Sequence, residues 1–331
     1  MSRSFRIFAV VTLASTAPIA CTGKLDAGSD LSHGLLPVDE RNPIVISNDD
    51  PTGNWFGEYA MLLAQGGHAS VAGIIVNSSA YWPDINANMA GWTSMAQAAL
   101  ASGMRGIPDP LASPNLPLRR PADGNIDTTV PNGSAGARFI IETSRRLAIP
   151  YRPLVVATGG SLTDVADAYL VDPTVAERIV VVSALGRDAI DPTVLNGPNG
   201  FLDPWANTIV VQRLQYVQVN AFSDQSVLVP AARLAELPAN AFGTWVAGKQ
   251  SQIYGVVGGD EQVSVIAAML PSFVLAVERM SQSGTVATVY GDVPALSLDP
   301  NGRVSVVTSA DAVLATSRFW QLLLAPSTYG R

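Results

Sequence analysis

The chain has 331 residues, of which 48% are hydrophobic and 14% are charged, so it can bury a large core and is not intrinsically disordered. Its 20 basic residues against 27 acidic residues give a formal charge of −7. Because phosphate groups are bound by clustered cations, this balance argues against a nucleic acid as a main partner. One cysteine and two histidines leave mostly oxygen ligands for any metal site, which favours Ca²⁺ or Mg²⁺ over Zn²⁺.

The N-terminal residues have the layout of a secretory signal peptide. Two arginines precede an apolar run over residues 7–20, which is shorter than the about 20 residues that a membrane span requires. Residues 17–21, Ala-Pro-Ile-Ala-Cys, resemble the lipobox of bacterial lipoproteins, although the proline replaces the usual aliphatic residue. We therefore expect residues 1–21 to be a signal peptide, Cys21 to carry a lipid, and the protein to be exported to the cell envelope. The alternative is a plain signal peptide that is cut nearby and releases a periplasmic or secreted protein.

After a flexible tether over residues 22–42, residues 43–331 predict one domain of the α/β class. Short β-branched runs alternate with helical patterns, which is the signature of an open, mainly parallel, Rossmann-like sheet flanked by helices. In chain order, we expect strand 44–46, helix 55–65, strand 73–76, helices 89–102 and 136–147, strand 154–157, helix 162–171, strand 179–182, helix 204–212, strand 216–219, and helices 229–237 and 261–269. A late β-hairpin is expected between residues 285–290 and 304–308 around the turn at 299–302, before a last helix over 310–324.

The loop after the first predicted strand is the richest in polar groups. In an open parallel sheet, ligands bind beyond the carboxyl ends of the strands. The first strand leads into the polar residues 47–54, and Glu58 follows where a helix begins. Crowded carboxylates at a buried strand end resist joint ionisation unless a cation neutralises them, and oxygen ligands of this kind suit Ca²⁺. The alternative is that Asp50 or Asn54 merely caps the helix.

This loop resembles a stretched form of the N-terminal aspartate motif of the inosine-uridine preferring nucleoside hydrolase family. In that motif a strand ends in Asp-x-Asp-Pro-Gly-x-Asp-Asp. Matching on the proline carries the second family aspartate onto Asp50 and the third onto Asn54, and it leaves Asn48 at the first. With a short insertion in the loop, Glu58 stands in for the fourth.

A second segment, residues 154–164 continued by 172–182, is similar to the family's central strand, its glycine-rich Leu-Thr-Asn turn, and the helix and strand that follow. The family threonine whose backbone carbonyl binds the metal corresponds to Thr158, and Ser161 is an inserted residue. The alternative, an ordinary strand, turn and helix, would explain the glycines but not the match of the whole segment in order.

Shorter matches follow in the same order as in the family. Residues 199–206 resemble its Asn-x-x-x-Asp-Pro-x-Ala segment and carry the ribose-binding asparagine onto Asn199. Asp260 inherits the metal-ligand role of a family His-Asp pair, and Asn77 falls near an early active-site asparagine. The likeness extends over about residues 43–270.

The resemblance implies a hydrolase that cleaves the N-glycosidic bond of a ribonucleoside or related glycoside with a Ca²⁺-activated water. Asp50 would also be the general base. The implied metal ligands are three carboxylates and one backbone carbonyl, from Asp50, Glu58, Asp260 and Thr158. The implied substrate-binding residues are three asparagines, Asn54, Asn77 and Asn199.

Three departures from the family pattern bear on catalysis. Asn48, Gly197 and Gly259 stand where the family has an aspartate, a glutamate and a histidine. The histidine's loss leaves no obvious general acid, a group typically worth roughly 10² to 10⁴ in rate. Four aromatic residues could stack on a base or a sugar: Tyr81, Trp82, Trp92 and Trp205. Aromatic residues at such spacings more often belong to the core.

Two other functions stay open beside the hydrolase. One is a catalytically degenerate lipoprotein that binds a ligand or a metal, and the other is a structural envelope lipoprotein that uses the fold as a platform. The expected partners are a small molecule of the nucleoside or ribosyl type and, through the lipid anchor alone, a membrane. The sequence also leaves room for a homo-oligomer.

Overall fold

A computed structural model describes residues 35–51, 54–80, 82–184, 198–219, 229–250 and 261–330. The predicted signal peptide, Cys21 and Asp260 lie outside the described residues. The end of the predicted tether is described, and its residues Leu36 and Val38 are buried in the larger apolar cluster of the protein. Within the described ranges, no helix is both long enough and apolar enough to cross a membrane.

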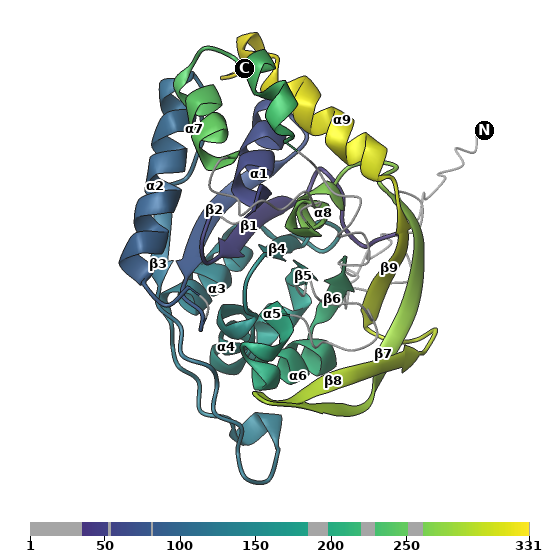
Figure 1. Cartoon of the computed structure of the whole chain (residues 1–331). Helices are drawn as coiled ribbons and strands as arrows, with labels where there is room; N and C mark the ends of the chain where they lie inside the picture. Colours follow the sequence, from purple (N-terminus) through teal and green to yellow (C-terminus); the bar gives the residue numbers. More distant parts are fainter. Residues whose placement is uncertain are drawn as a thin grey trace, which may run out of the picture.

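The described residues form one nine-stranded sheet in the order β3-β2-β1-β4-β5-β6-β9-β7-β8 (Figure 1). Every neighbouring pair from β3 to β9 in this order is parallel, and β7 is antiparallel to both of its neighbours. The open, mainly parallel sheet predicted from the sequence is therefore confirmed. The strands are β1 (Pro43–Asn48), β2 (Ser70–Asn77), β3 (Pro110–Ser113), β4 (Leu154–Thr158), β5 (Ile179–Ser183), β6 (Gln215–Gln218), β7 (Val274–Thr288), β8 (Gly291–Leu298) and β9 (Val304–Ala310).

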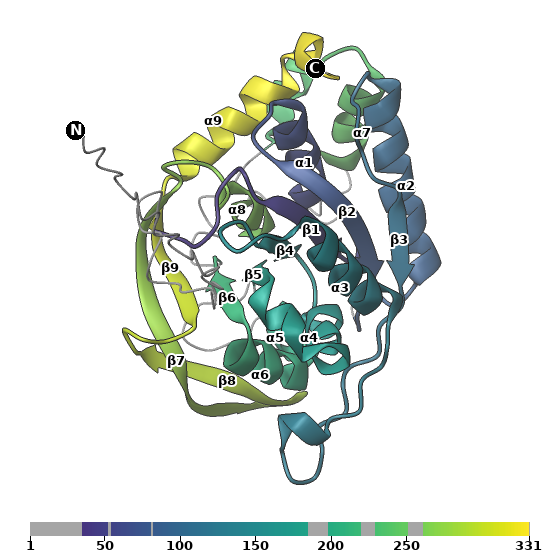
Figure 2. The same ribbon diagram turned by 180° about the vertical axis from the view of Figure 1, so that it is seen from behind.

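Helices cover both faces of the sheet, as the two opposite views in Figures 1 and 2 show. The helices are α1 (Phe56–Gln65), α2 (Ile85–Ala101), α3 (Ala135–Leu147), α4 (Thr163–Val171), α5 (Pro198–Phe201), α6 (Pro204–Arg213), α7 (Ala241–Gln250), α8 (Glu261–Ala267) and α9 (Ala312–Leu323). The helix predicted over residues 229–237 is a 3₁₀-helix, Ala231–Glu236, and α7 was not predicted.

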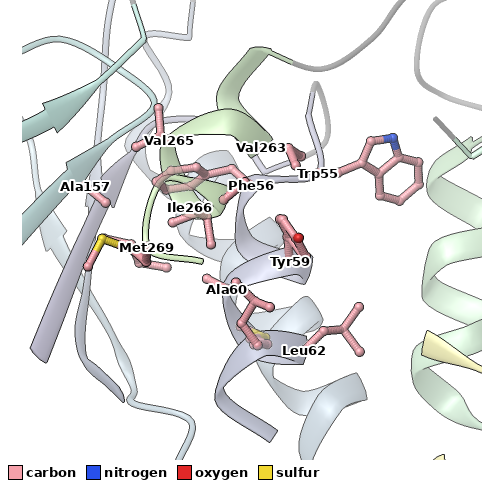
Figure 3. Packing of buried hydrophobic residues seen from close by; sticks show 14 of the residues in the cluster. Trp55, Phe56, Tyr59, Ala60, Leu62, Ala157, Val263, Val265, Ile266 and Met269 are labelled. Carbon is pink, nitrogen blue, oxygen red and sulfur yellow. The ribbon is translucent and has the colours of Figure 1, made fainter. Parts of the chain in front are cut away.

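Alternation along the central strands divides the core into two apolar clusters. In β1, Ile44 and Ile46 pack with α1, α2, α7, α8 and α9, whereas Val45 packs on the other face with α3, α4 and α6. A parallel strand buried on both faces reads as a continuous run of β-branched residues, which explains why the sequence pattern located it. Figure 3 shows the first cluster, where Phe56 of α1 and Ile266 of α8 lie among the buried side chains.

The late antiparallel hairpin exists, but its strands pair differently from the prediction. Residues 285–288 pair with residues 291–294, and residues 304–307 pair with residues 277–280. The predicted turn at 299–302 therefore joins β8 to β9 instead of closing the hairpin. The reason is the length of β7, whose 15 residues give each half a different antiparallel partner.

The chain order reverses between β1 and β4. From β1 the chain moves outward to β2 and β3, then returns to β4 and moves the other way to β5 and β6. The register pairs Ser47 with Thr158, and the Gly159 N–H donates to the Ser47 carbonyl at 3.0 Å. The loops after β1 and β4 therefore start side by side at the topological switch point, where open α/β sheets bind their ligands.

Candidate active site

Strands β1 to β6 each end in a polar residue that is buried. These are Asn48, Asn77, Ser113, Thr158, Ser183 and Gln218, and none is more than 1% exposed. Because the strands are parallel, their carboxyl ends meet at one edge of the sheet. Buried polar groups need hydrogen-bond partners, so this edge is where a polar ligand is best accommodated.

The centre of this edge lies between β1, β2 and β4. The Asn77 Nδ2 donates to the Ser47 Oγ at 3.1 Å, while the Asn77 Oδ1 is buried without a hydrogen-bond partner. A Cβ placed on Gly160 would lie 3.2 Å from that Oδ1 and 3.7 Å from the Asn48 Oδ1. The lack of a side chain at position 160 therefore lets the backbone of the loop after β4 approach both amide oxygens closely.

Two adjacent aspartates follow β1. The Asp49 carboxylate accepts hydrogen bonds from the Ser79 Oγ at 2.7 Å and from the Asp50 N–H at 2.8 Å. Burial raises the pKa of Asp49 to about 6, and the charge of Asp50 adds to the rise while the bond from Ser79 offsets part of it. Trp92 fixes the backbone here, since its Nε1 donates to the Asp49 carbonyl at 2.9 Å. Asp49 was not among the predicted site residues, although its place at the strand end was a usable signal.

Glu58 forms a buried ion pair with Lys249 of α7. Their side chains are 0% and 1% exposed, and the Lys249 Nζ lies 2.6 Å from the Glu58 Oε1. The Trp245 Nε1 donates to the same oxygen at 2.8 Å, and the Glu58 Oε2 is buried without a hydrogen-bond partner. Lys249 also donates to the Asn54 carbonyl and lies over the Trp55 ring, 4.7 Å from its centroid. The carboxylate predicted to bind a metal is thus already paired with a cation of the protein.

Sequence reasoning missed Lys249 because it did not predict α7. The chain has only two lysines, Lys24 and Lys249, so the second is the sole lysine of residues 43–331. Because the other Lys and Arg residues of the domain are all arginines, the single lysine was the one sequence signal that pointed to Lys249.

Asn54 and Asn199, both predicted to bind the substrate, make hydrogen bonds within the protein. The Asn54 Oδ1 accepts from the Phe56 N–H at 3.1 Å, but the N-cap residue of α1 is Trp55 and no side chain among the described residues caps the helix. The Asn199 Nδ2 donates to the Gly159 carbonyl at 2.9 Å and to the Ala184 carbonyl at 3.0 Å, so it ties the end of β5 to the loop after β4. The Asn199 Oδ1 takes part in neither of these bonds, because an amide oxygen accepts hydrogen bonds and cannot donate them.

The structure brings some predicted residues together and separates others. The backbones around Asp50 and Thr158 adjoin at the switch point, and Asn77 and Asn199 flank them. Glu58 instead contacts α7. Among the residues that the structure describes, no group of three or more histidine, cysteine, aspartate and glutamate side chains is placed to hold a metal ion.

The aromatic candidates also differ in position. Trp92 lies beneath the loop after β1, whereas Trp205 packs in the cluster on the opposite face and its Nε1 donates to the Thr129 Oγ1 at 3.0 Å. Trp82 is partly buried near Ser79, whose Oγ accepts from the Trp82 N–H at 3.1 Å. Tyr81 lies outside the described residues.

A second buried polar cluster supports the loops on the α3 face. The Asp164 Oδ1 accepts from the hydroxyls of Ser113 and Ser134, each at 2.8 Å, while its Oδ2 is buried without a partner. Asp203 caps α6 by accepting from the Ala206 N–H at 3.0 Å. Burial raises the pKa of Asp164 and of Asp203 to about 6 in each case. Both carboxyls therefore carry a cost when they ionise.

Comparisons with solved structures find the same architecture in nucleoside hydrolases. The chain is similar to an inosine-guanosine nucleoside hydrolase (TM-score 0.63, 16% identity, 85% of this chain and 98% of that chain) and to a plant nucleoside hydrolase (0.59, 16%, 86% and 99%). It is also similar to an inosine-uridine preferring nucleoside hydrolase from Bacillus anthracis (0.54, 15%, 85% and 99%). Neither a family model nor a curated protein matches the chain. At these identities the likeness shows the fold, and the chain has the nucleoside hydrolase fold.

Proposed function

We propose that the chain hydrolyses an N-glycosidic bond of a ribonucleoside or a related glycoside at the switch point between β1 and β4. The observation that carries this proposal is the buried polar edge, where the amide oxygens of Asn48 and Asn77 lie beside Gly160. The Asn77 Oδ1, which is buried without a hydrogen-bond partner, is suited to accept a hydrogen bond from a sugar hydroxyl. The fold shared with nucleoside hydrolases supports the same substrate class.

Two neighbouring carboxyls are suited to the two proton transfers of such a reaction. Glycoside hydrolysis needs a base that activates water and an acid that protonates the leaving group. In the proposal Asp50 is the base. Asp49, whose pKa is raised to about 6 by burial, keeps its proton to a higher pH than an exposed aspartate does and is the candidate acid that the sequence lacked.

The predicted Ca²⁺ does not fit the described residues as a ligand set. Glu58 is bonded to Lys249 and Trp245, and Asp260, the remaining predicted carboxylate, lies outside the described ranges. The proposed steps therefore use no metal ion, and the calcium role of Asp50, Glu58, Thr158 and Asp260 stays a prediction.

The test is a hydrolysis assay with purified protein. Inosine, uridine and a chromogenic riboside are incubated with the chain, with and without Ca²⁺, and the released reducing sugar is measured. We expect release that Asp50→Asn lowers by at least about 10²-fold. Asp127→Asn, which changes a carboxylate that is 71% exposed, is the matched control and leaves the rate unchanged. Equal rates for the wild type and Asp50→Asn would contradict the assignment.

A binding protein without turnover is the second candidate. It is favoured by Asn48, Gly197 and Gly259, which stand where the resembled family has an aspartate, a glutamate and a histidine. Calorimetry with ribose and inosine, in a preparation that releases no sugar, would support this candidate.

Export and lipidation at Cys21 remain proposals, as does a homo-oligomer. Incorporation of a labelled fatty acid in cells, and its loss in Cys21→Ser, tests the anchor and the envelope location together. Light scattering of the purified chain tests the oligomer.

A further inference from the structure

We propose that the Lys249 ammonium is the resident cation of the loop after β1, and that it replaces the divalent metal ion that the sequence resemblance implies. Glu58 is then committed to a lysine instead of a metal. The inference concerns the same loop as the proposed function, but it does not require turnover to be tested.

The contacts of Lys249 converge on one short segment. Its Nζ lies 2.6 Å from the Glu58 Oε1, donates to the Asn54 carbonyl and lies over the Trp55 ring. These three residues belong to the same stretch that leads from the end of β1 into the first turn of α1. A carboxylate, a carbonyl and an aromatic face together satisfy an ammonium group. The lysine therefore occupies the place beside Glu58, one of the four residues that the sequence resemblance assigned to a metal ion.

Burial makes this pairing exclusive. The two side chains are 1% and 0% exposed, so neither charge is solvated by bulk water. A buried ammonium that lost its carboxylate would be left uncompensated, which is strongly unfavourable. A divalent ion at the unpartnered Glu58 Oε2 would lie close to the ammonium group held at Oε1, and the repulsion between the two cations opposes its binding. The Trp245 N–H, bonded to the same Oε1, further holds the carboxylate toward α7.

The charge of Glu58 is also balanced without a metal. The pair of Glu58 and Lys249 is neutral, and both side chains are buried. A carboxylate whose charge a buried ammonium already balances has weak attraction for a divalent cation.

The test measures the melting temperature of the purified chain in EDTA and in millimolar Ca²⁺, together with calorimetry of Ca²⁺ binding. For the wild type we expect no binding and a change within about 1 °C. Lys249→Met should lower the melting temperature in EDTA by at least about 5 °C, because the Glu58 carboxylate is left buried and unpaired. Added Ca²⁺ should recover part of that loss by binding the freed carboxylate.

Two further variants complete the test. Lys249→Met combined with Glu58→Gln should lose less than Lys249→Met alone, and it should not respond to Ca²⁺. Arg145→Met is the control, since it breaks an exposed pair with Asp172 and should change the melting temperature by no more than about 1 °C. A wild type that Ca²⁺ stabilises by several degrees, with the effect lost in Glu58→Gln, would overturn the inference even if no variant of Lys249 folds. Because these readouts need no turnover, failure of the hydrolysis assay would not affect them.

Discussion

Replacing Asp164 by asparagine should stabilise the protein at neutral pH. The carboxyl is fully buried, and only its Oδ1 is hydrogen-bonded, to the hydroxyls of Ser113 and Ser134. Burial raises its pKa from 3.8 to about 6, which corresponds to a cost of about 3 kcal/mol when the folded protein ionises it. The folded state binds the proton more tightly than the unfolded state. The free energy of unfolding therefore falls as the pH rises from about 4 to about 6, and it stays low above that range.

Asp164→Asn removes this ionisation while it keeps an oxygen for the two serines. The melting temperature of the variant, measured by circular dichroism, should exceed that of the wild type by several degrees at pH 7.5. The excess should shrink toward zero near pH 4, where the wild-type carboxyl is protonated. Asp127→Asn, at an exposed position, should show no such pH dependence. A variant that is less stable than the wild type at pH 7.5 would refute the reasoning, because it would mean that the ionised carboxylate stabilises the fold.

Three other variants test local packing and hydrogen bonds by urea unfolding. Gly302→Ala should cost about 2–4 kcal/mol, because a Cβ there would lie 2.0 Å from the Met280 carbonyl oxygen; an unchanged midpoint would disprove that contact. Trp92→Phe should cost about 1–3 kcal/mol through loss of its bond to the Asp49 carbonyl, and stability equal to the wild type would contradict this. Asn199→Ala should lower the free energy of unfolding by about 1–3 kcal/mol, because it leaves two backbone carbonyls unpaired. A loss smaller than that caused by replacing an exposed asparagine would contradict this prediction.

The central sheet was predictable because its strands are continuous β-branched runs between polar loops. β1, β4 and β5 are buried on both faces, and their sequences show it without any alternation. α7 was missed because Gly243 and Gly248 interrupt its pattern, and its helical form depends on packing against α2. β3 has four residues, which is too short to give a periodic signal.

Only those parts of the site that depend on short stretches of sequence were predictable. The polar loop after β1 and the glycines after β4 are read directly from the chain, and the parallel sheet brings them together. The pairing of Glu58 with Lys249 joins residues 191 positions apart, and no local pattern carries information about it. The raised pKa values of Asp49 and Asp164 come from burial, which is likewise a property of the complete fold.

The two outermost strands of the sheet restrict how one molecule can join another. β3 is short and starts at Pro110, and β8 carries Pro294 in its middle. A proline has no N–H to offer, so neither border presents an uninterrupted row of donors to a strand from a second copy. Continuation of the sheet across two molecules at these two borders is thereby disfavoured.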